Sequence, residues 1–323
     1  MQVYRNSDIL PCFNRAVITI GTFDGVHTGH QEIIRQLKQE AKKIGGETVI
    51  ITFDPHPRKI VGNSQKEIRL IYSLSEKIEL LAWNGIDHLV IVPFTEAFSQ
   101  MTAEEYIGDF LIKQFRPHTI IIGYDHRFGR GRQGNYQLME QMSSVYSYEL
   151  CEIPVHVLNQ ISVSSTRIRE AISSSDMRTA NSLLGYTFFF EGKVVEGNKL
   201  GRTIGYPTAN LELVDSEKLL PGNGVYAVEL AISNSQDTSE HSLFTTDHSL
   251  FKGMMNIGFR PTVDGSKKVI EVNIFDFDLD IYGETIKVYV RSHLRKEQKF
   301  NGIDALKEQL GKDKIVALAS WKD

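Results

Sequence analysis

The sequence predicts two folded units in series: a doubly wound α/β domain with a parallel sheet, followed by a small antiparallel β-barrel. Length is the first observation, because 323 residues exceed the usual size of one domain, about 100–200 residues. The second is the hydrophobic pattern, which alternates strand and helix periods in the first half and becomes almost entirely strand-like in the second. We therefore place the domains at residues 1–184 and 185–323.

Composition narrows the class of protein. A hydrophobic content of 41% and a charged content of 24% are typical of a globular chain. With 36 basic and 40 acidic residues, the net charge of −4 argues against a large nucleic-acid interface. No apolar run approaches the roughly 18 residues needed to cross a bilayer, and no signal segment opens the chain. The two isolated cysteines, Cys12 and Cys151, predict no disulfide framework, so a cytoplasmic location is the simplest interpretation.

The first domain begins with a buried strand at 16–20, a helix at 30–44 and a second strand at 48–53. Two strands joined through one helix form a right-handed βαβ unit with parallel strands. The same pattern predicts further helices at 74–84, 102–115, 135–143 and 165–173, and further strands at 88–93, 118–123 and 149–157. Ligands bind such sheets at the carboxyl ends of the strands, so we look for a site there.

The second domain contains several short strands separated by Gly, Pro and Asp turns, which is typical of a small barrel. Strands are expected at 188–195, 224–232, 251–257, 269–277 and 286–290, with one helix near 302–310. Residues 233–249 are polar and predict a long loop, to which we assign no role.

The segment from Gly21 to His30, GTFDGVHTGH, connects the first strand to the first helix. Glycines allow close approach of the backbone to a ligand, and a helix N-terminus presents free N–H groups to phosphate. His27 and His30, at the start of that helix, can both donate hydrogen bonds to a triphosphate. The alternative is that the two histidines merely cap the helix.

A second phosphate-binding segment, Ser164 to Arg169, opens a later helix. Its hydroxyls suit an N-cap, and an arginine in the next turn reaches a phosphate with several donors. Ile168, Ala171 and Ile172 form the apolar face, which leaves the arginines free of the core. Taken alone, the segment could equally be a capped surface helix.

Two more segments lie at the expected carboxyl ends of strands, at 52–57 and 123–134. The prolines of the first give a rigid wall, although an ordinary loop is the alternative. In the second, Phe128 can stack on an aromatic ring and Asp125 can help to hold Mg²⁺. This segment also holds the one dense basic cluster, which can take a substrate phosphate and comprises Arg127, Arg130 and Arg132.

These segments together resemble a known family. His27-Thr28-Gly29-His30 resembles the HxGH signature of the nucleotidyltransferases, and 164–169 resembles their ISSTxxR segment. Those proteins transfer a nucleotide monophosphate by direct in-line attack on the α-phosphorus of a nucleoside triphosphate. Segments 52–57 and 123–134 are similar to the flavin-adenylating domain of the bacterial bifunctional riboflavin kinase/FAD synthetases, although His126 stands where that family usually has phenylalanine. The resemblance implies that the catalytic residues are His27, His30 and Arg169. The implied ATP site comprises Gly21, Phe23, Asp24, His27, His30, Ser164, Thr166 and Arg169. The implied flavin site comprises Asp54, Pro55, Pro57, Asp125, Arg127 and Phe128.

In the second domain, residues 197–211 combine glycines with a lysine, an arginine, Thr208 and Asn210. The segment is not a Walker A loop, because it lacks the Gly-Lys-Ser/Thr ending. Residues two apart on an extended segment face the same way, so Thr208 and Asn210 can offer two oxygens to Mg²⁺ or phosphate. From the residues alone, a glycine-rich turn in a barrel remains an equal alternative.

This segment resembles the GRxxGxPTAN signature of riboflavin kinases, and residues 224–226, 256–262 and 270–277 also match that domain. Residues 294–300 resemble the part that closes over the flavin. The resemblance implies Glu271 as the catalytic base, with Thr208 and Asn210 as metal ligands. From the residues alone, the Glu271 side chain faces either the barrel mouth or solvent. At Asn273 the chain departs from the family pattern, since many relatives carry histidine there. The implied ATP and flavin contacts are Gly201, Arg202, Gly205, Pro207, Thr208, Asn210 and Arg295.

The resemblance extends over nearly the whole chain and implies a six-stranded barrel with a C-terminal helix. It implies a bifunctional enzyme that phosphorylates riboflavin with ATP and then adenylates FMN to FAD, with Mg²⁺ as cofactor. The implied partners are small-molecule substrates and apo-flavoproteins that receive the product, with no nucleic acid or membrane. Two other hypotheses are another cytidylyl- or adenylyltransferase with the same HxGH signature, and a flavin carrier without turnover.

Overall fold

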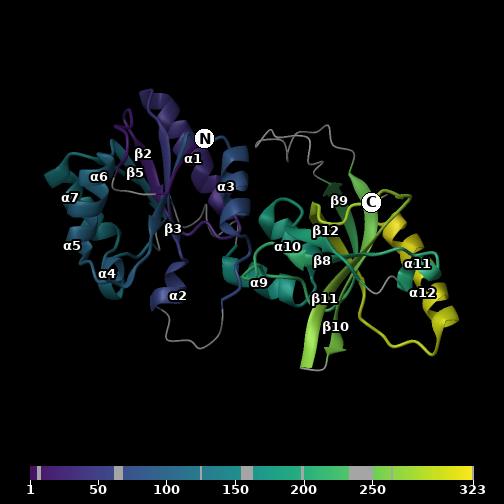
Figure 1. Ribbon diagram of the computed structural model, residues 1–323. Coiled ribbons are helices and arrows are strands. Elements are labelled where there is room, and N and C mark those ends of the chain that lie inside the picture. Colours follow the sequence, from purple (N-terminus) through teal and green to yellow (C-terminus); the bar gives the residue numbers. More distant parts are fainter. Residues whose placement is uncertain are drawn as a thin grey trace. The chain divides into compact units, whose positions relative to one another are not determined.

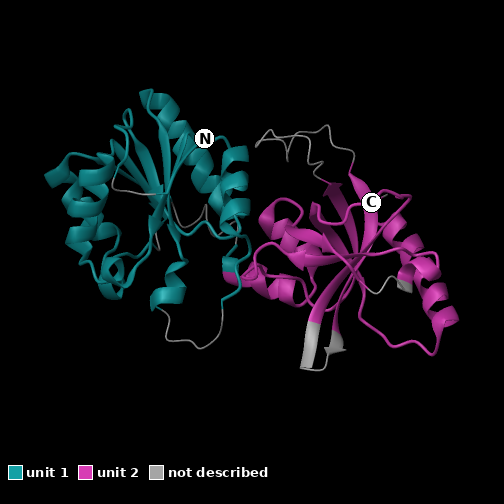
Figure 2. Cartoon of the chain, viewed as in Figure 1, with its two compact units in different colours: residues 1–165 teal, residues 166–323 magenta. Residues whose placement is uncertain are grey.

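The computed structural model describes residues 1–5, 9–61, 68–123, 126–153, 163–197, 200–232, 250–262 and 265–321. The chain divides into two compact units, 1–165 and 166–323, which Figure 2 colours separately. Asp125 and the predicted loop 233–249 lie outside the described residues.

The first unit contains a six-stranded sheet in which all neighbouring strands run parallel, as the sequence predicts. Its order is β1-β4-β3-β2-β5-β6, so β3 and β2 lie at the centre. The central strands β2 and β3 are buried at every position except the last residue of β3, which is typical of a parallel sheet covered on both faces. The strands are β1 (Gln2–Tyr4), β2 (Val17–Ile20), β3 (Thr48–Asp54), β4 (His88–Pro93), β5 (Thr119–Gly123) and β6 (Glu149–Ile153).

Helices cover the sheet on both sides in Figure 1, with α1 and α3 on one side and α5 to α7 on the other. Helix α1 ends at Gly45, whose φ of +63° is the left-handed conformation that glycine adopts without strain. The helices are α1 (Thr28–Ile44), α2 (Pro57–Val61), α3 (Leu74–Trp83), α4 (Glu96–Ser99), α5 (Ala103–Glu105), α6 (Lys113–Phe115) and α7 (Tyr136–Tyr146).

The helix predicted at 102–115 differs in its middle. Between α5 and α6 lies a π-helix, η1 (Tyr106–Ile112), and the N–H of Lys113 bonds to the carbonyl oxygen of Gly108. Tyr106 and Phe110 point into the core from this segment, with ring centroids 5.2 Å apart. The apolar pattern predicts a helix here but cannot distinguish the wider π turn, because its buried positions are nearly the same.

The second unit is built on a closed barrel in which every neighbouring pair of strands is antiparallel. Six strands follow the order β10-β11-β8-β7-β12-β9, and β9 pairs again with β10. This confirms the predicted architecture. The strands are β7 (Phe189–Val195), β8 (Ala209–Leu213), β9 (Gly224–Ile232), β10 (Phe251–Thr262), β11 (Gly265–Ile274) and β12 (Thr285–Arg295).

Helices accompany the barrel, and α12 packs against β9, β10 and β12. Helix α9 begins at the last residue of the first unit. The terminal helix is longer than predicted because exposed apolar residues such as Ile315 and Val316 obscure its periodicity. The helices are α9 (Ser165–Ser173), α10 (Met177–Leu184), α11 (Leu200–Thr203) and α12 (Ile303–Ala319).

The hydrophobic pattern does not predict strands β1 and β8, because both are too short to show a clear strand period. Strand β8 lies within the glycine-rich segment 197–211 and has only five residues. Its pairing with β7 and β11 converts part of that predicted loop into barrel wall.

Candidate active sites

A strained turn connects β2 to α1 in the first unit. Within it Phe23, Gly25 and Val26 have φ values of +46°, +96° and +37°. A positive φ is rare for a β-branched residue such as valine, and such strain commonly persists where it serves a site. The turn brings His27 to the N-cap of α1, at the carboxyl end of the central strand β2.

His27 and His30 stack face to face, with ring centroids 3.7 Å apart and planes 15° apart. His27 Nδ1 accepts the main-chain N–H of His30 at 3.3 Å, which leaves the proton of a neutral ring on Nε2. A Cβ on Gly29 would lie 3.2 Å from the His27 ring, so glycine keeps this position open. His27 therefore caps the helix with one nitrogen and has the other available for a ligand.

Burial keeps both imidazoles neutral near pH 7. Burial lowers the pKa of His27 to about 4 and the pKa of His30 well below 6.5. The nearby His27 and Lys77 lower the pKa of His30 further. His30 Nδ1 is buried and has no hydrogen-bond partner among the described residues. Neutral histidines with uncommitted ring nitrogens can donate to phosphate oxygens, which is the role that the sequence predicts for this pair.

Asp24 is 1% exposed and fixes the segment that leads into α3. Its Oδ1 accepts the main-chain N–H groups of Ile71 at 3.0 Å and Tyr72 at 3.4 Å. Ser165 Oγ donates to the Asp24 carbonyl oxygen at 2.9 Å. The carboxylate predicted to bind ATP thus holds together the loops around the histidine turn.

Helix α3 brings an unpredicted cation to this edge of the sheet. Lys77 lies on the buried face of α3 and is 6% exposed. Burial lowers the pKa of Lys77, and the charges of Asp24 and Asp54 oppose this effect. The charge of Lys77 in turn lowers the pKa of His30. No hydrogen bond or ion pair holds its Nζ within the described residues. A buried cation without a partner carries a desolvation cost that an anionic ligand would offset.

The predicted flavin residues differ in exposure. Asp54, the last residue of β3, and Pro55 are exposed, and Pro57 begins α2. Phe128 is only 6% exposed and stacks on Tyr106, with centroids 5.0 Å apart. Arg127 is exposed. The ring predicted to stack on flavin is thus packed within the aromatic core.

Of the other predicted ATP contacts, Gly21 lies directly after β2, where a Cβ would come within 3.2 Å of the Phe23 ring. That ring contacts His30, with centroids 4.9 Å apart. Ser164 and Thr166 are exposed at the start of α9, and Arg169 is half-buried on that helix. The predicted apolar face of α9 is buried, and it comprises Ile168, Ala171 and Ile172.

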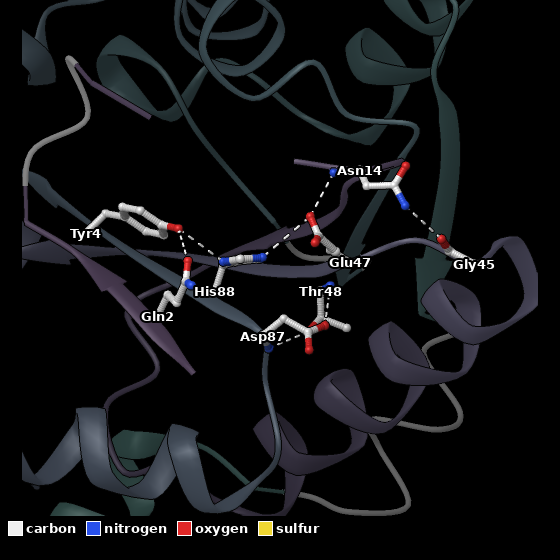
Figure 3. Close-up of polar contacts among 8 residues, drawn as sticks. All are labelled: Gln2, Tyr4, Asn14, Gly45, Glu47, Thr48, Asp87 and His88. Atoms are coloured by element: carbon white, nitrogen blue, oxygen red, sulfur yellow. Dashed lines mark hydrogen bonds and ion pairs between the residues drawn. The ribbon is translucent and has the colours of Figure 1, made fainter. Parts of the chain in front are cut away.

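A polar cluster lies around the amino ends of β3 and β4 and includes Tyr4 of β1 (Figure 3). His88 Nε2 lies 3.5 Å from Glu47 Oε2, and its Nδ1 lies 3.4 Å from the Tyr4 hydroxyl. Asp87 Oδ2 accepts from the Thr48 hydroxyl at 2.7 Å. These groups bond to one another across neighbouring strands, so the cluster ties the sheet edge together.

In the second unit, a cavity of about 230 Å³ lies between the barrel and α12. Four of the predicted kinase residues line it, namely Gly201, Thr208, Glu271 and Arg295. Glu271, on β11, pairs in register with Asn210 on β8 and with Asn256 on β10. Directly opposed residues have Cβ atoms about 5 Å apart, so Glu271 is flanked by two amides. The glutamate thus contributes to a cavity wall.

Asn210 and Thr208 are held close to glycines. A Cβ on Gly197 would overlap the Asn210 amide, and one on Gly201 would overlap the Tyr206 carbonyl oxygen. Among the predicted residues, Asn210, Arg202, Gly205 and Pro207 do not line the cavity. Gly205 has a φ of +81° and forms the turn before β8. Gly197 and Gly201 therefore allow close packing of neighbouring segments, and Gly205 allows the chain to turn.

Arg295 is already engaged within the protein. Its Nε and Nη2 donate to the Asp313 carboxylate of α12 at 2.9 Å and 2.8 Å, and its Nη1 donates to the Lys296 carbonyl oxygen. Asp313 is 3% exposed. The arginine predicted to contact ligand thus joins β12 to the terminal helix beside the cavity.

Known protein families match both halves of the chain. Models for FAD synthetase and riboflavin kinase match residues 10–167 and 184–321. The bifunctional riboflavin kinase/FMN adenylyltransferase of Escherichia coli K12 is 36% identical over 301 residues, 93% of this chain and 91% of the relative. The chain belongs to the bifunctional riboflavin kinase/FMN adenylyltransferase family.

Further known proteins match this chain over most of its length. The Haemophilus influenzae enzyme is 34% identical over 94% of this chain and 93% of its own length. A crystal structure from Streptococcus pneumoniae, titled as a macrolide-efflux protein, covers 98% of both chains at 32% identity with a TM-score of 0.83. In this chain, none of the described helices is both long and apolar enough to span a membrane.

Against this family background, the sequence reasoning missed Lys77, Asp313 and the contact of Asn273. Lys77 did carry a signal, because it stands three residues before Leu80 on the apolar face of a predicted helix. Asp313 lies beyond the predicted end of α12, and the partner of Asn273 is 66 residues away in the sequence. No spacing rule identifies such a partner.

Proposed function

We propose that this protein makes FAD from riboflavin in two steps, one in each of the domains predicted from the sequence, with adenylylation in residues 1–184 and the kinase step in residues 185–323. The observation that carries the proposal is the match of 36% identity over 93% of the chain to a bifunctional riboflavin kinase/FMN adenylyltransferase. The histidine turn and the glutamate-lined cavity supply one candidate site for each step.

In the kinase step, the riboflavin 5′-hydroxyl attacks the γ-phosphorus of ATP, and ADP leaves as the bond to the β-phosphate oxygen breaks. Glu271 would accept the hydroxyl proton, since it lines the cavity and carries a carboxylate. Such catalysis depends mainly on positioning the reactants and stabilising charge. Gly201 and Gly205 would let the backbone approach the phosphates, with Arg202 and Pro207 as further contacts.

The residues around Glu271 fit a magnesium ion. Thr208 Oγ1 and the Asn210 amide oxygen are hard oxygen ligands, and Asn210 stands in register with Glu271. Magnesium needs only one or two protein ligands when phosphates supply the others, and when bound it neutralises phosphate charge. We therefore assign Thr208 and Asn210 as its ligands in the kinase site, and Asp125 as a ligand in the other site.

In the adenylylation step, a phosphate oxygen of FMN attacks the α-phosphorus of ATP, and pyrophosphate leaves. The FMN phosphate is already anionic near neutral pH, so this step needs charge stabilisation more than a base. His27, His30 and Arg169 would donate to the phosphates, with Ser164 and Thr166 at the start of α9 as further contacts. The flavin side would be lined by Asp54, Pro55, Pro57 and Arg127, with the buried Phe128 packed behind them in the aromatic core.

The test is to incubate the protein with riboflavin, ATP and Mg²⁺ and to separate the flavins by chromatography. We expect FMN and then FAD; absence of both contradicts the proposal. Supplying choline phosphate or nicotinate mononucleotide in place of FMN distinguishes other HxGH transferases, since only FMN should be adenylated. The two free cysteines fit a cytoplasmic location, where apo-flavoproteins would receive the product.

A further inference from the structure

Asn273 stands on β11 two residues after Glu271, so both side chains leave the same face of the barrel. It lines the kinase cavity and is 7% exposed. Its Nδ2 donates to the carbonyl oxygen of Pro207 at 2.7 Å. This buried amide connects β11 to the segment that precedes β8.

The bond occurs where the regular ladder stops. Strand β11 pairs with β8 up to Val272 and Ala209, and continuing that register places Asn273 opposite Thr208. The paired residues end there, and the Asn273 side chain instead bonds the residue directly before Thr208. One amide thus extends the strand pairing to the start of the Thr208–Asn210 segment.

We propose that Asn273 is a positioning residue of the kinase site, which holds Thr208 and Asn210 at the distance from Glu271 that MgATP requires. The inference rests on the proposed kinase function and adds a residue to it. Loss of the bond removes the donor from the Pro207 carbonyl oxygen and allows the segment to move. A displacement of about 1 Å in such a segment weakens positioning without removing any ligand atom.

The variant Asn273→Leu keeps approximate size and removes the donor. We expect its KM for MgATP in FMN formation to rise about fivefold, which corresponds to the usual contribution of one hydrogen bond, about 1 kcal/mol. The KM for riboflavin should stay within about twofold, because the proposal gives Asn273 no contact with the flavin. Asn273→His, whose ring can present an N–H in the same direction, should recover most of the MgATP affinity.

Two controls separate positioning from general loss of structure. Asn181 Nδ2 also donates to a main-chain carbonyl oxygen in this unit, that of Val290 at 3.0 Å, but lies outside the cavity. Asn181→Leu should lower the unfolding temperature and leave the KM for MgATP unchanged. FAD formation from added FMN should be normal in both leucine variants, because neither side chain is among the residues proposed for adenylylation.

An unchanged KM for MgATP in Asn273→Leu overturns the inference, as does a rise confined to the KM for riboflavin. An equal rise in Asn181→Leu also overturns it, because the effect would then be general. If Asn273→Leu does not fold, Asn273→His decides: normal stability with a raised KM for riboflavin alone contradicts positioning. Failure of the wild-type protein to make FMN is a separate result, which contradicts the proposed function instead.

Discussion

The stacked histidines make the first unit sensitive to acid. His27 has a folded pKa of about 4, below the usual value of 6.5, so the unfolded chain binds its proton first as the pH falls. The stability that neutral His27 contributes is therefore complete above about pH 6.5 and is lost as the pH falls toward 4, by up to about 3 kcal/mol. Urea unfolding of the wild type between pH 7 and 4 measures this slope. His27→Asn, which keeps a good N-cap, should reduce this slope; equal slopes would rule out His27 as a source.

Lys77 offers a test in which activity and stability move in opposite directions. Replacing this buried cation with methionine removes a desolvation cost, so Lys77→Met should unfold at an equal or higher urea concentration. FAD formation should fall about a hundredfold, the usual effect of losing one preorganised charge near a phosphate. Lys42→Met, an exposed change on α1, is the control and should alter neither. Normal FAD formation by Lys77→Met would show that the lysine is structural.

Glu271→Gln tests the assigned base with almost no change in shape. FMN formation should fall by roughly 10²–10⁴-fold, the usual contribution of a positioned base. Binding of riboflavin, followed by quenching of its fluorescence, should change little. Adenylation of added FMN should be unaffected. Near-normal kinase turnover in the variant would assign the proton to another acceptor.

At the scale of elements, α12 depends on one buried ion pair. Asp313 binds the Arg295 guanidinium through two of its nitrogens, and their side chains are 4% and 20% exposed. Asp313→Asn should lower the free energy of unfolding of the second unit by about 2–3 kcal/mol, because Arg295 keeps its charge without a counterion. It should also raise the KM for riboflavin, since Arg295 and Phe300 line the cavity.

Guanidinium unfolding and steady-state kinetics measure these two effects. The matched control is Glu308→Gln, which removes an exposed i,i+4 partner of Lys312 on the same helix and should have no measurable effect. Equal behaviour of the two variants would mean that α12 is held by its apolar contacts alone.

The elements also show how much of the fold and the sites the sequence can predict. The βαβ pattern and the strand spacing predict both folds, and the strand–turn–helix setting predicts that His27 and His30 meet at one helix start. The sequence pattern does not predict that Arg295 pairs with Asp313 or that Phe128 enters the core, because these two contacts depend on how distant segments pack. Local pattern determines the elements, whereas side-chain contacts are decided by tertiary neighbours.

At the scale of the whole molecule, the structure suggests where the chain can be divided. Residues 166–184 bond to the barrel: Asn181 Oδ1 accepts the N–H of Phe188 at 2.8 Å, and Ser175 Oγ lies 2.8 Å from the Tyr226 hydroxyl. Helix α10 also packs on β12. The sequence boundary before residue 185 would remove these contacts.

We therefore expect residues 166–323 expressed alone to fold and to convert riboflavin to FMN. Residues 185–323 should unfold at least about 10 °C lower, since the loss of α10 removes several buried apolar side chains worth about 1–2 kcal/mol each. Thermal unfolding and FMN production by the two fragments measure the difference. Equal melting temperatures would favour the boundary at residue 185.

The closed barrel has a consequence for how the separated units behave in concentrated solution. A closed ring of strands leaves no unpaired edge, so a barrel fragment presents no template for edge-to-edge association with a second molecule. The open sheet of the first unit ends at β1 and β6, of which β1 has only three residues. Self-association of isolated units through strand pairing should therefore begin at β6.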